Sequence, residues 1–216
     1  MPALGYDVSQ HQGQVDHVAM AKGGFTFCYA RMTIGTTETD DRAAENRRAI
    51  RDAGLIRGLY HVCTGLSDPS TQAEHFVDVA KPRPDDFLVF DIERGNPDLW
   101  PRKSPAEILD INRQIVRRVK ELAPRNAMFV YTGSFWRDDM GNPDDDLGCR
   151  LILAAYVTGD PKRFRPRAWK AIAIHQFTDG QEPTKHSVPG VPGNCDQNRY
   201  LLGDADHFRR LLRGGG

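Results

Sequence analysis

Phe87-Leu88-Val89-Phe90-Asp91-Ile92-Glu93 is the stretch of this 216-residue chain that most directly indicates its fold. The four leading residues are apolar on both faces, which is typical of a parallel strand buried on both sides of a sheet. Asp91 and Glu93 follow at the carboxyl end, two positions apart. Because alternate residues of a strand face the same way, we expect both carboxylates to enter one cavity, with their backbones ~6.6 Å apart.

Similar short apolar runs recur along the chain and alternate with amphipathic segments. The other predicted strands are Leu4–Val8, Phe25–Arg31, Ile56–Val62, Ala127–Tyr131, Leu151–Tyr156 and Ala171–Phe177. The predicted helices are Asp40–Ala53, Thr71–Ala80, Ser104–Leu122 and Asp204–Leu212. The third helix has the clearest start, because Ser104 can cap it, Pro105 suits the first turn and Glu107 completes a capping box.

Strands that alternate with helices pair in parallel through right-handed crossovers. Seven or eight such strands predict an α/β fold, a modified and irregular (β/α) TIM-like barrel. The chain is shorter than the ~250 residues usual for this barrel, so we expect some helices to be short or missing. Thr132–Cys149 and Thr178–Asn194 have the composition of loops. An open doubly wound sheet is the alternative, although the sequence has no GxGxxG after a strand and no P-loop.

The overall composition limits the classes of partner. The 29 basic and 29 acidic residues cancel, which disfavours nucleic acid, since phosphate binding usually needs a basic excess. No segment approaches the ~20 apolar residues that span a bilayer, so no membrane partner is expected. The amino end, MPALGYDVSQ, has neither the basic nor the apolar region of a signal peptide. We expect one monomeric domain over residues 1–213, with the start of a glycine-rich linker or tail at 214–216.

The four cysteines are too far apart for the CxxC spacing of zinc sites, so we expect no metal and no other cofactor. Cys28 and Cys63 lie in apolar, strand-like sequence and are predicted to be buried free thiols. Cys149 and Cys195 lie in loop-like sequence. The sequence leaves open whether these two form a disulfide.

Functional groups of a (β/α) barrel collect where its strands end. Each of the seven predicted strands ends near an aromatic residue, a carboxylate or both, which predicts that the seven ends meet in one pocket. The side chains singled out at these ends are Asp7, Arg31, Tyr60, Asp91, Glu93, Tyr131, Tyr156 and Gln176. Two histidines, His61 and His175, also lie there. Their simpler interpretation is packing in the core, and the tyrosines have the same alternative.

The pair Asp91 and Glu93 predicts acid–base chemistry. Two close carboxylates resist joint ionisation, so one pKa is raised, and a carboxylic acid with a raised pKa can protonate a leaving oxygen. Glu93 has the longer reach and is assigned the acid role, while Asp91 stays ionised and stabilises positive charge. Asp-x-Glu is common by chance, and the buried strand before it is what gives the pair weight.

At these residues the sequence resembles the glycoside hydrolase family 25 muramidases, the Chalaropsis-type lysozymes. The likeness runs from about Leu4 to Leu212 and keeps its order. It is carried by GYDVSQHQG (5–13), RMTIGTTETD (31–40), AGLIRGLYHV (53–62), FLVFDIE (87–93), FVYTGSFW (129–136), LILAAY (151–156), IHQFTDG (174–180) and PGVPGNCDQN (189–198). Two positions depart from the family pattern. Arg31 stands in a strand end that often reads Lys-Ala-Thr-Glu, and His11 replaces a frequent aromatic residue.

The resemblance implies an enzyme that cleaves the β-1,4 bond between N-acetylmuramic acid and N-acetylglucosamine in bacterial peptidoglycan. It implies Glu93 as general acid/base and Asp91 as its charged neighbour, with Asp7 and Asp196 completing the acidic site. Residues expected to contact the sugars are Arg31, Tyr60, Tyr131, Trp136, Tyr156 and Gln176. The substrate's 2-acetamido oxygen is the expected nucleophile if the reaction is substrate-assisted.

Other functions remain open at this stage. A metal-dependent hydrolase could use Asp7, Asp91, Glu93, His61 and His175, although the sequence has no HxH or HExxH pair. A wall-binding barrel without catalysis and a chitinase-like barrel are further alternatives. The cellular setting is also open. The resemblance suits a phage endolysin, held in the cytoplasm until release to the cell wall, or a secreted bacterial enzyme whose leader has been removed.

Overall fold

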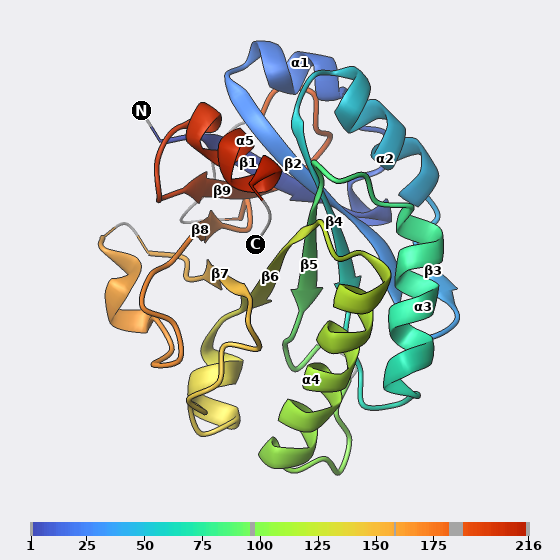
Figure 1. The fold of residues 1–216 in the computed structure, drawn as a ribbon. Helices are drawn as coiled ribbons and strands as arrows, with labels where there is room; N and C mark the ends of the chain where they lie inside the picture. Colours follow the sequence, from blue (N-terminus) through green and yellow to red (C-terminus); the bar gives the residue numbers. More distant parts are fainter. Residues whose placement is uncertain (1, 96–97, 158, 182–187, 215–216) are drawn as a thin grey trace.

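A computed structural model describes residues 2–95, 98–157, 159–181 and 188–214, and in them eight strands close into a barrel (Figure 1). The barrel order is β1-β9-β8-β7-β6-β5-β4-β2, and β1 pairs with β2 to close the circle. The barrel strands are β1 (Leu4–Val8), β2 (Phe25–Ile34), β4 (Ile56–Val62), β5 (Phe87–Asp91), β6 (Ala127–Thr132), β7 (Arg150–Ala154), β8 (Ile174–Thr178) and β9 (Asp196–Tyr200). The predicted barrel is therefore confirmed.

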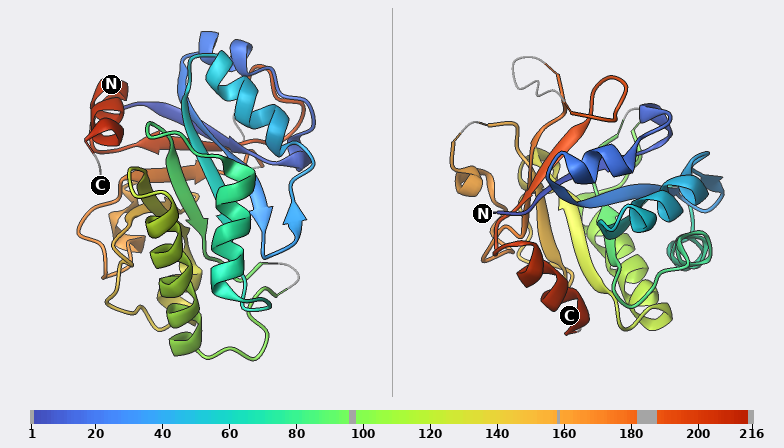
Figure 2. Two further views of the ribbon diagram at one scale, coloured as in Figure 1. Left: turned by 45° about the vertical axis from the view of Figure 1, so that its right-hand side comes forward. Right: turned by 90° about the horizontal axis from the view of Figure 1, so that it is seen from above.

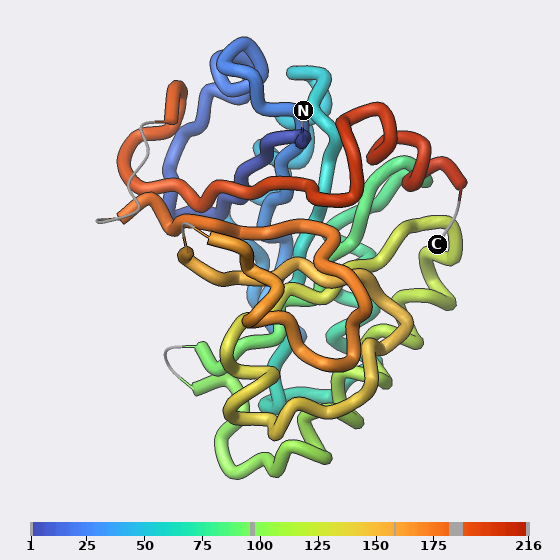
Figure 3. Tube along the Cα trace, turned by 90° about the vertical axis from the view of Figure 1, so that its left-hand side faces the viewer, coloured from blue at the N-terminus to red at the C-terminus, as the bar shows by residue number. Residues whose placement is uncertain are grey.

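One barrel strand runs against the others. Neighbouring pairs from β1 through β2 to β8 are parallel, whereas β9 is antiparallel to both β8 and β1. Figure 3 shows β9 lying between β1 and β8. The sequence did not predict β9, because Asp-Gln-Asn-Arg-Tyr has no apolar run. β2 also extends past its predicted end and forms a hairpin with β3 (Glu38–Thr39), since Met32–Ile34 are still suited to a strand.

The helices cover the barrel unevenly. Figure 2 shows the three longest helices along one side of the molecule, where α2 and α3 contact β2 and α3 packs on α4. Their bounds are α2 (Ala43–Asp52), α3 (Pro69–Ala80) and α4 (Pro105–Leu122). The shorter helical elements are η1 (Gln10–Gln12), α1 (His17–Lys22), η2 (Phe135–Asp139), η3 (Pro161–Phe164) and α5 (Ala205–Arg213). The expectation of short or missing helices holds for the described residues between β6 and β8, where only η2 and η3 are helical.

Local sequence explains the helix boundaries. The capping box at α4 is present, because the Glu107 carboxylate accepts from the Ser104 backbone N–H at 2.8 Å and the Ser104 hydroxyl accepts from the Glu107 N–H. Gly54 follows α2 with φ 76°, a left-handed conformation that suits glycine. α2 begins at Ala43 rather than Asp40, because the Asp40 carboxylate accepts from the Arg42 N–H and from the Arg31 guanidinium instead of entering the helix.

The closed end of the barrel is filled with aromatic rings. Phe27, Phe87 and Phe129 point inward from three strands, and Phe208 of α5 packs against all three. Phe208 also stacks on Tyr200 with ring centroids 4.3 Å apart. The short carboxyl-terminal helix therefore plugs one end of the barrel, which leaves the opposite end free for a site.

Several smaller predictions can be compared with the structure. All four cysteines are buried free thiols, which confirms the prediction for Cys28 and Cys63 and shows that Cys149 and Cys195 do not pair. His61 and His175 are held in the fold by hydrogen bonds to Thr33 and the Ala155 carbonyl. None of the described helices is long and apolar enough to cross a bilayer.

Two predicted segments fall partly outside the described residues. Of the expected tail at 214–216, only Gly214 is described, as the residue after α5, and 215–216 lie outside. Of the predicted loop from 178 to 194, residues 182–187 lie outside. The described residues at 179–181 and 188–194 form bends and turns with no helix or strand, which agrees with the prediction.

Candidate active site

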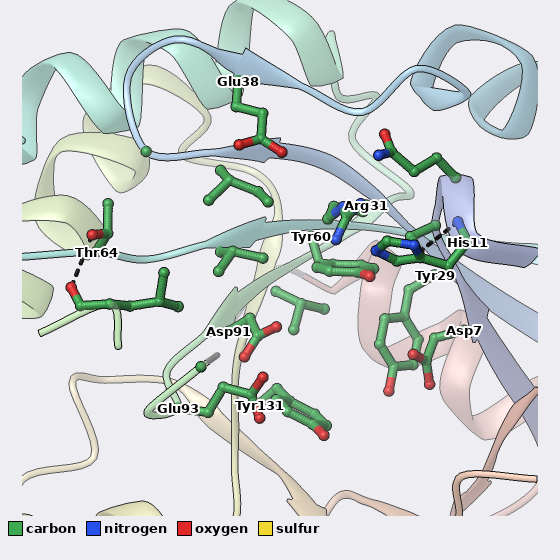
Figure 4. Close-up of a pocket in the computed structure, with 18 of the residues that line it drawn as sticks. Asp7, His11, Tyr29, Arg31, Glu38, Tyr60, Thr64, Asp91, Glu93 and Tyr131 are labelled. Carbon is green, nitrogen blue, oxygen red and sulfur yellow. Dashed lines mark hydrogen bonds between the residues drawn. The ribbon is translucent and has the colours of Figure 1, made fainter. Parts of the chain in front are cut away.

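A cavity of about 850 Å³ opens at the carboxyl ends of the parallel strands, opposite the α5 plug. Five carboxylates line it, and four of them were predicted from the sequence, namely Asp7, Asp91, Glu93 and Asp196; the fifth is Glu38. Figure 4 shows Asp91 and Glu93 together beside Tyr131, with Asp7 and Tyr29 farther along the cavity. The strand ends predicted to converge do meet here.

The end of β5 is held firmly by its neighbours. Asp91 lies in register with Val62 and Tyr131, and its carbonyl accepts from the Cys63 N–H at 3.0 Å. Ile92 faces the outer apolar layer, so Asp91 and Glu93 both face the cavity, as the strand alternation predicts. Beyond the strand, the Trp100 indole N–H donates to the Glu93 carbonyl at 2.7 Å. This bond fixes the backbone that carries Glu93.

Asp7 is buried, with 7% of its surface exposed, and it belongs to a polar network. Its Oδ2 accepts from the Asn198 amide at 2.7 Å and from the Gln176 amide at 3.0 Å. The side-chain amide oxygen Oδ1 of Asn198 in turn accepts from the Tyr29 hydroxyl at 2.9 Å. Burial raises the pKa of Asp7, while the two donors on its carboxylate orient the side chain and oppose this rise.

Gln176 connects Asp7 to the tyrosines of the cavity. Its Oε1 accepts from the Tyr131 hydroxyl at 2.9 Å and from the Tyr156 hydroxyl at 3.0 Å. Both ends of the amide group are thus bonded, with its nitrogen on Asp7 and its oxygen on two phenols. Tyr131 and Tyr156 are held at the cavity wall by this arrangement.

Asp196 reaches the cavity because β9 is antiparallel. It is the first residue of β9, yet it lies beside Asp7, its register partner on β1. A parallel strand would deliver its last residue to this rim, so the reversed strand delivers its first. Burial and the neighbouring charges of Asp7, Asp179 and Glu93 raise the pKa of Asp196 to about 8.

The electrostatics of the cluster favour protonated acids. Burial, followed by repulsion from Glu93 and Asp7, raises the pKa of Asp91 well above its ordinary value. Burial, followed by repulsion from Asp7, also raises the pKa of Glu93, although its side chain is exposed to the cavity. One oxygen of Asp91, Oδ1, is buried and has no hydrogen-bond partner. Asp91 lines the cavity with part of its hydrogen-bonding capacity unused, so its carboxylate is suited to a donor from a ligand.

Arg31 brings a positive charge to the wall of this cavity. Its Nε donates to Asp40 at 2.8 Å, and its charge lowers the pKa of Asp91 against the effect of burial. The Arg31–Asp40 pair is buried, so the positively charged Arg31 guanidinium is held in a fixed position at the cavity wall. Arg31 therefore contacts Asp40 rather than lying free, while still lining the cavity.

The predicted sugar-contact residues are placed as follows. Arg31, Tyr60, Tyr131, Tyr156 and Gln176 all line the cavity. Burial raises the pKa of the Tyr60 and Tyr131 hydroxyls well above the ordinary value, so both stay neutral hydrogen-bonding groups. Their contact with a sugar stays a prediction.

Trp136 is the exception, and the sugar contact predicted for it does not hold. Its side chain has 0% of its surface exposed, packs edge-on against Trp169 with centroids 5.0 Å apart, and donates to the Pro143 carbonyl. The chain turns at η2 immediately after β6, which directs Trp136 into the outer core. No face of the indole remains for a ligand.

The residues of the site to which the sequence assigned no role include Tyr29, Trp100 and Asn198. Tyr29 lies near the end of the predicted strand Phe25–Arg31 and could have been selected by the same strand-end rule. Asn198 lies on β9, which has no apolar signal, and Trp100 acts from a loop through its backbone partner. Nothing in the local sequence distinguishes the last two.

The positions of two histidines argue against the metal-binding alternative. His61 bonds to Thr33 and Gln72 on the outer side of the strands, and His175 bonds to the Ala155 carbonyl. Neither lines the cavity. Among the residues that the structure describes, no three His, Cys, Asp or Glu side chains are grouped so as to hold a metal ion.

A second cavity of about 550 Å³ adjoins the first at Glu93, Tyr131 and Tyr156. Its walls include Phe135, Phe164, Arg94 and Arg137. Glu93 thus stands at the junction of two cavities, one acidic and one that is aromatic and contains arginines. An elongated ligand could cross the junction beside its carboxyl group.

Comparison with known proteins identifies related chains. Residues 6–186 match the model of the glycosyl hydrolases family 25. The chain is 36% identical over 204 residues to the autolytic lysozyme of Clostridium acetobutylicum, which covers 92% of this chain and 56% of that protein. It is 37% identical over 73 residues to lysozyme M1 of Streptomyces globisporus, covering 33% of this chain and 25% of that protein. The matches therefore span about half or less of these relatives.

Solved structures agree with the fold over the full chain. The muramidase of Trichobolus zukalii is 26% identical with a TM-score of 0.85, covering 98% of this chain and 99% of that one. A family GH25 lysozyme from Aspergillus fumigatus is 26% identical with a TM-score of 0.81, and the match covers 100% of both chains. A bacterial lysozyme from Streptomyces coelicolor shares the fold at 23% identity, with a TM-score of 0.88, covering 100% of this chain and 99% of that one. The family match over most of the sequence and this shared barrel confirm the resemblance first drawn from the strand ends: the chain belongs to the glycosyl hydrolases family 25.

Proposed function

We propose that this chain hydrolyses the β-1,4 bond between N-acetylmuramic acid and N-acetylglucosamine in peptidoglycan, with Glu93 as general acid and base. The observation that carries the proposal is the place of Glu93, a carboxyl group with a raised pKa at the junction of an acidic and an aromatic cavity. Relatives and structural neighbours that are named lysozymes and muramidases support the same reaction.

The charge distribution sets the direction of the substrate. Glycoside cleavage builds positive charge on the sugar whose anomeric carbon is attacked. Asp7, Asp91 and Asp196 lie in the first cavity, so that sugar belongs there, and the leaving sugar belongs in the second cavity. Glu93 lies between them and donates its proton to the departing oxygen.

Asp91 is suited to orient the substrate rather than to hold the proton. Its carboxylate lines the cavity and can accept from the N–H of the 2-acetamido group, which directs the acetamido oxygen toward the anomeric carbon. That oxygen attacks as the glycosidic oxygen leaves with the proton of Glu93. This attack closes a ring between the acetamido oxygen and the anomeric carbon. Water then attacks the same carbon and opens this ring, while Glu93 takes a proton from the water. A donor bonded to Asp91 also favours its ionised form, which leaves the proton on Glu93.

The finer parts of the proposal concern partners and setting. We propose that residues 1–213 act as a single, monomeric catalytic domain whose partner is the glycan strand of the bacterial wall. The enzyme reaches the wall either by release from the cytoplasm, as an endolysin does, or by secretion. A structural neighbour named CTP1L endolysin has the same fold at 23% identity, which supports the fold alone.

The test is mass spectrometry of purified peptidoglycan after digestion and borohydride reduction. New reduced N-acetylmuramic acid ends are expected with the wild type. A Glu93→Gln variant should lose about 10²–10⁴-fold in rate, the contribution of a general acid. Glu121→Gln, an exposed residue on α4, is the matched control and should cut normally. Reduced N-acetylglucosamine ends, peptide cleavage alone, or unchanged lysis by Glu93→Gln would refute the proposal.

A further inference from the structure

One side of the first cavity extends away from the carboxylates along a row of aliphatic residues. Asp91 is in register with Val62 on β4, and Val62 is in register with Ile34 on β2. Both aliphatic residues line the cavity, as do Leu66 and Leu99. We call Ile34, Val62, Leu66 and Leu99 the aliphatic arm. Since neighbouring strands lie ~4.8 Å apart, the arm reaches about 10 Å from Asp91.

The arm is held in place by its loops. The Thr64 hydroxyl and the Gly65 N–H both donate to the Leu99 carbonyl at 2.9 Å, and the Leu66 N–H donates to the Thr64 hydroxyl. Leu66 is nevertheless 64% exposed. Because an exposed leucine places apolar surface in water, a leucine at the edge of a cavity is suited to contact with a ligand.

The three directions out of the cavity differ in chemistry. Beyond Glu93 lie the rings of Phe135 and Phe164. Past Asp7 lie the polar side chains of η1, and Figure 4 shows His11 on that side and Glu38 and Thr64 on the other. Rings and hydrogen-bonding groups suit the faces and hydroxyls of a sugar chain. The arm has neither an aromatic ring nor a cation among the described residues that line it, so it suits a different part of the substrate.

We propose that the aliphatic arm binds the branch on the muramic acid, namely the lactyl ether and the first residue of the stem peptide. This inference rests on the proposed function. The lactyl methyl group would contact Val62, and the first peptide residue would lie between Ile34 and Leu66. The peptide N–H groups would face the Glu38 carboxylate and the Thr64 hydroxyl at the edge of the arm.

Charge also affects which form of the muramic acid branch the aliphatic arm binds. A lactyl group joined to a peptide is a neutral amide, whereas a lactyl group without its peptide is a carboxylate. Asp91 and Glu38 lie at the two ends of the arm, and Arg31 of the cavity wall is already paired with Asp40, so a further anion there would be repelled. The arm therefore selects glycan strands that carry peptides over strands from which an amidase has removed them.

The experiment measures kcat/KM on two glycan preparations of equal length, one with stem peptides and one stripped by an amidase. We expect the wild type to prefer the peptide-bearing strands by about tenfold, the range of discrimination that small apolar contacts provide. Leu66→Ala and Ile34→Ala should each reduce this ratio several-fold. Leu202→Ala, which removes an exposed leucine outside the cavity, should leave it unchanged.

The outcomes separate this inference from the proposed function. The proposed role of the arm would be overturned if the wild type cut both preparations equally well, or if the arm variants left the ratio unchanged. The muramidase proposal would stay intact in either case. A wild type that cuts neither preparation would overturn both. Thermal melts of Leu66→Ala and Ile34→Ala are recorded in parallel, so that a general loss of folding, which would lower both rates together, is recognised.

Discussion

Replacing Asp196 with asparagine should stabilise the fold at neutral pH while reducing activity. The pKa of Asp196 is raised from an ordinary 3.8 to about 8 by burial and by repulsion from Asp7. The fold therefore binds this proton more tightly than the unfolded chain does, and stability is lost as the pH rises from about 4 to about 8. At pH 7 the ceiling is about 4 kcal/mol, because each unit of pKa difference corresponds to about 1.4 kcal/mol. Solvent at the cavity mouth reduces this to roughly 1–3 kcal/mol.

The assay is urea unfolding of the wild type and Asp196→Asn at several values of pH. The advantage of the variant should be small near pH 4 and grow toward pH 8. Asp138→Asn is the control, because the pKa of this exposed carboxyl is lowered by Arg137 and its loss should bring no such gain. A variant that is less stable at pH 7, or an advantage that does not change with pH, would refute the electrostatic reasoning.

Three further predictions follow from other parts of the molecule. Trp100→Phe removes the donor to the Glu93 carbonyl and should lower kcat by about tenfold, with KM and the melting temperature nearly unchanged. Phe208→Ala should destabilise the fold by about 3–5 kcal/mol in urea unfolding, because a fully buried ring is lost from the barrel plug. The rate should fall on the alkaline side as Glu93 loses its proton, at a pH above that expected for an ordinary glutamic acid, and a rate profile from pH 4 to 9 tests this.

Much of the barrel could be predicted because its strands are buried on both sides. Five-residue apolar runs such as Leu4–Val8 and seven-residue runs such as Ile56–Val62 match the observed strands at both ends. α4 was equally clear, because a capping box and a proline mark its start. The carboxylates were found by a rule of topology, that parallel barrel strands end at the functional face.

What could not be predicted depends on contacts between distant segments. β9 is polar along its length and becomes a strand because β1 and β8 offer backbone partners on both sides. Asn198 then gains its role from Asp7, 191 residues away. The prediction that Trp136 contacts the sugars was wrong for a related reason. Its sequence position after a strand end suggested the cavity, but the turn of η2 directs the indole toward Trp169.

The aromatic plug and the acidic mouth are linked by the strands they share. On β5, Phe87 points to the plug and Asp91 to the cavity, and on β6 the same holds for Phe129 and Tyr131. A shift of β5 by one residue would bring Ile92 into the cavity and move Asp91 into the outer apolar layer. Tight packing of the rings on Phe208 resists such a shift, because each ring would lose its contacts. The plug thus fixes the register on which the alignment of the carboxylates in the cavity depends.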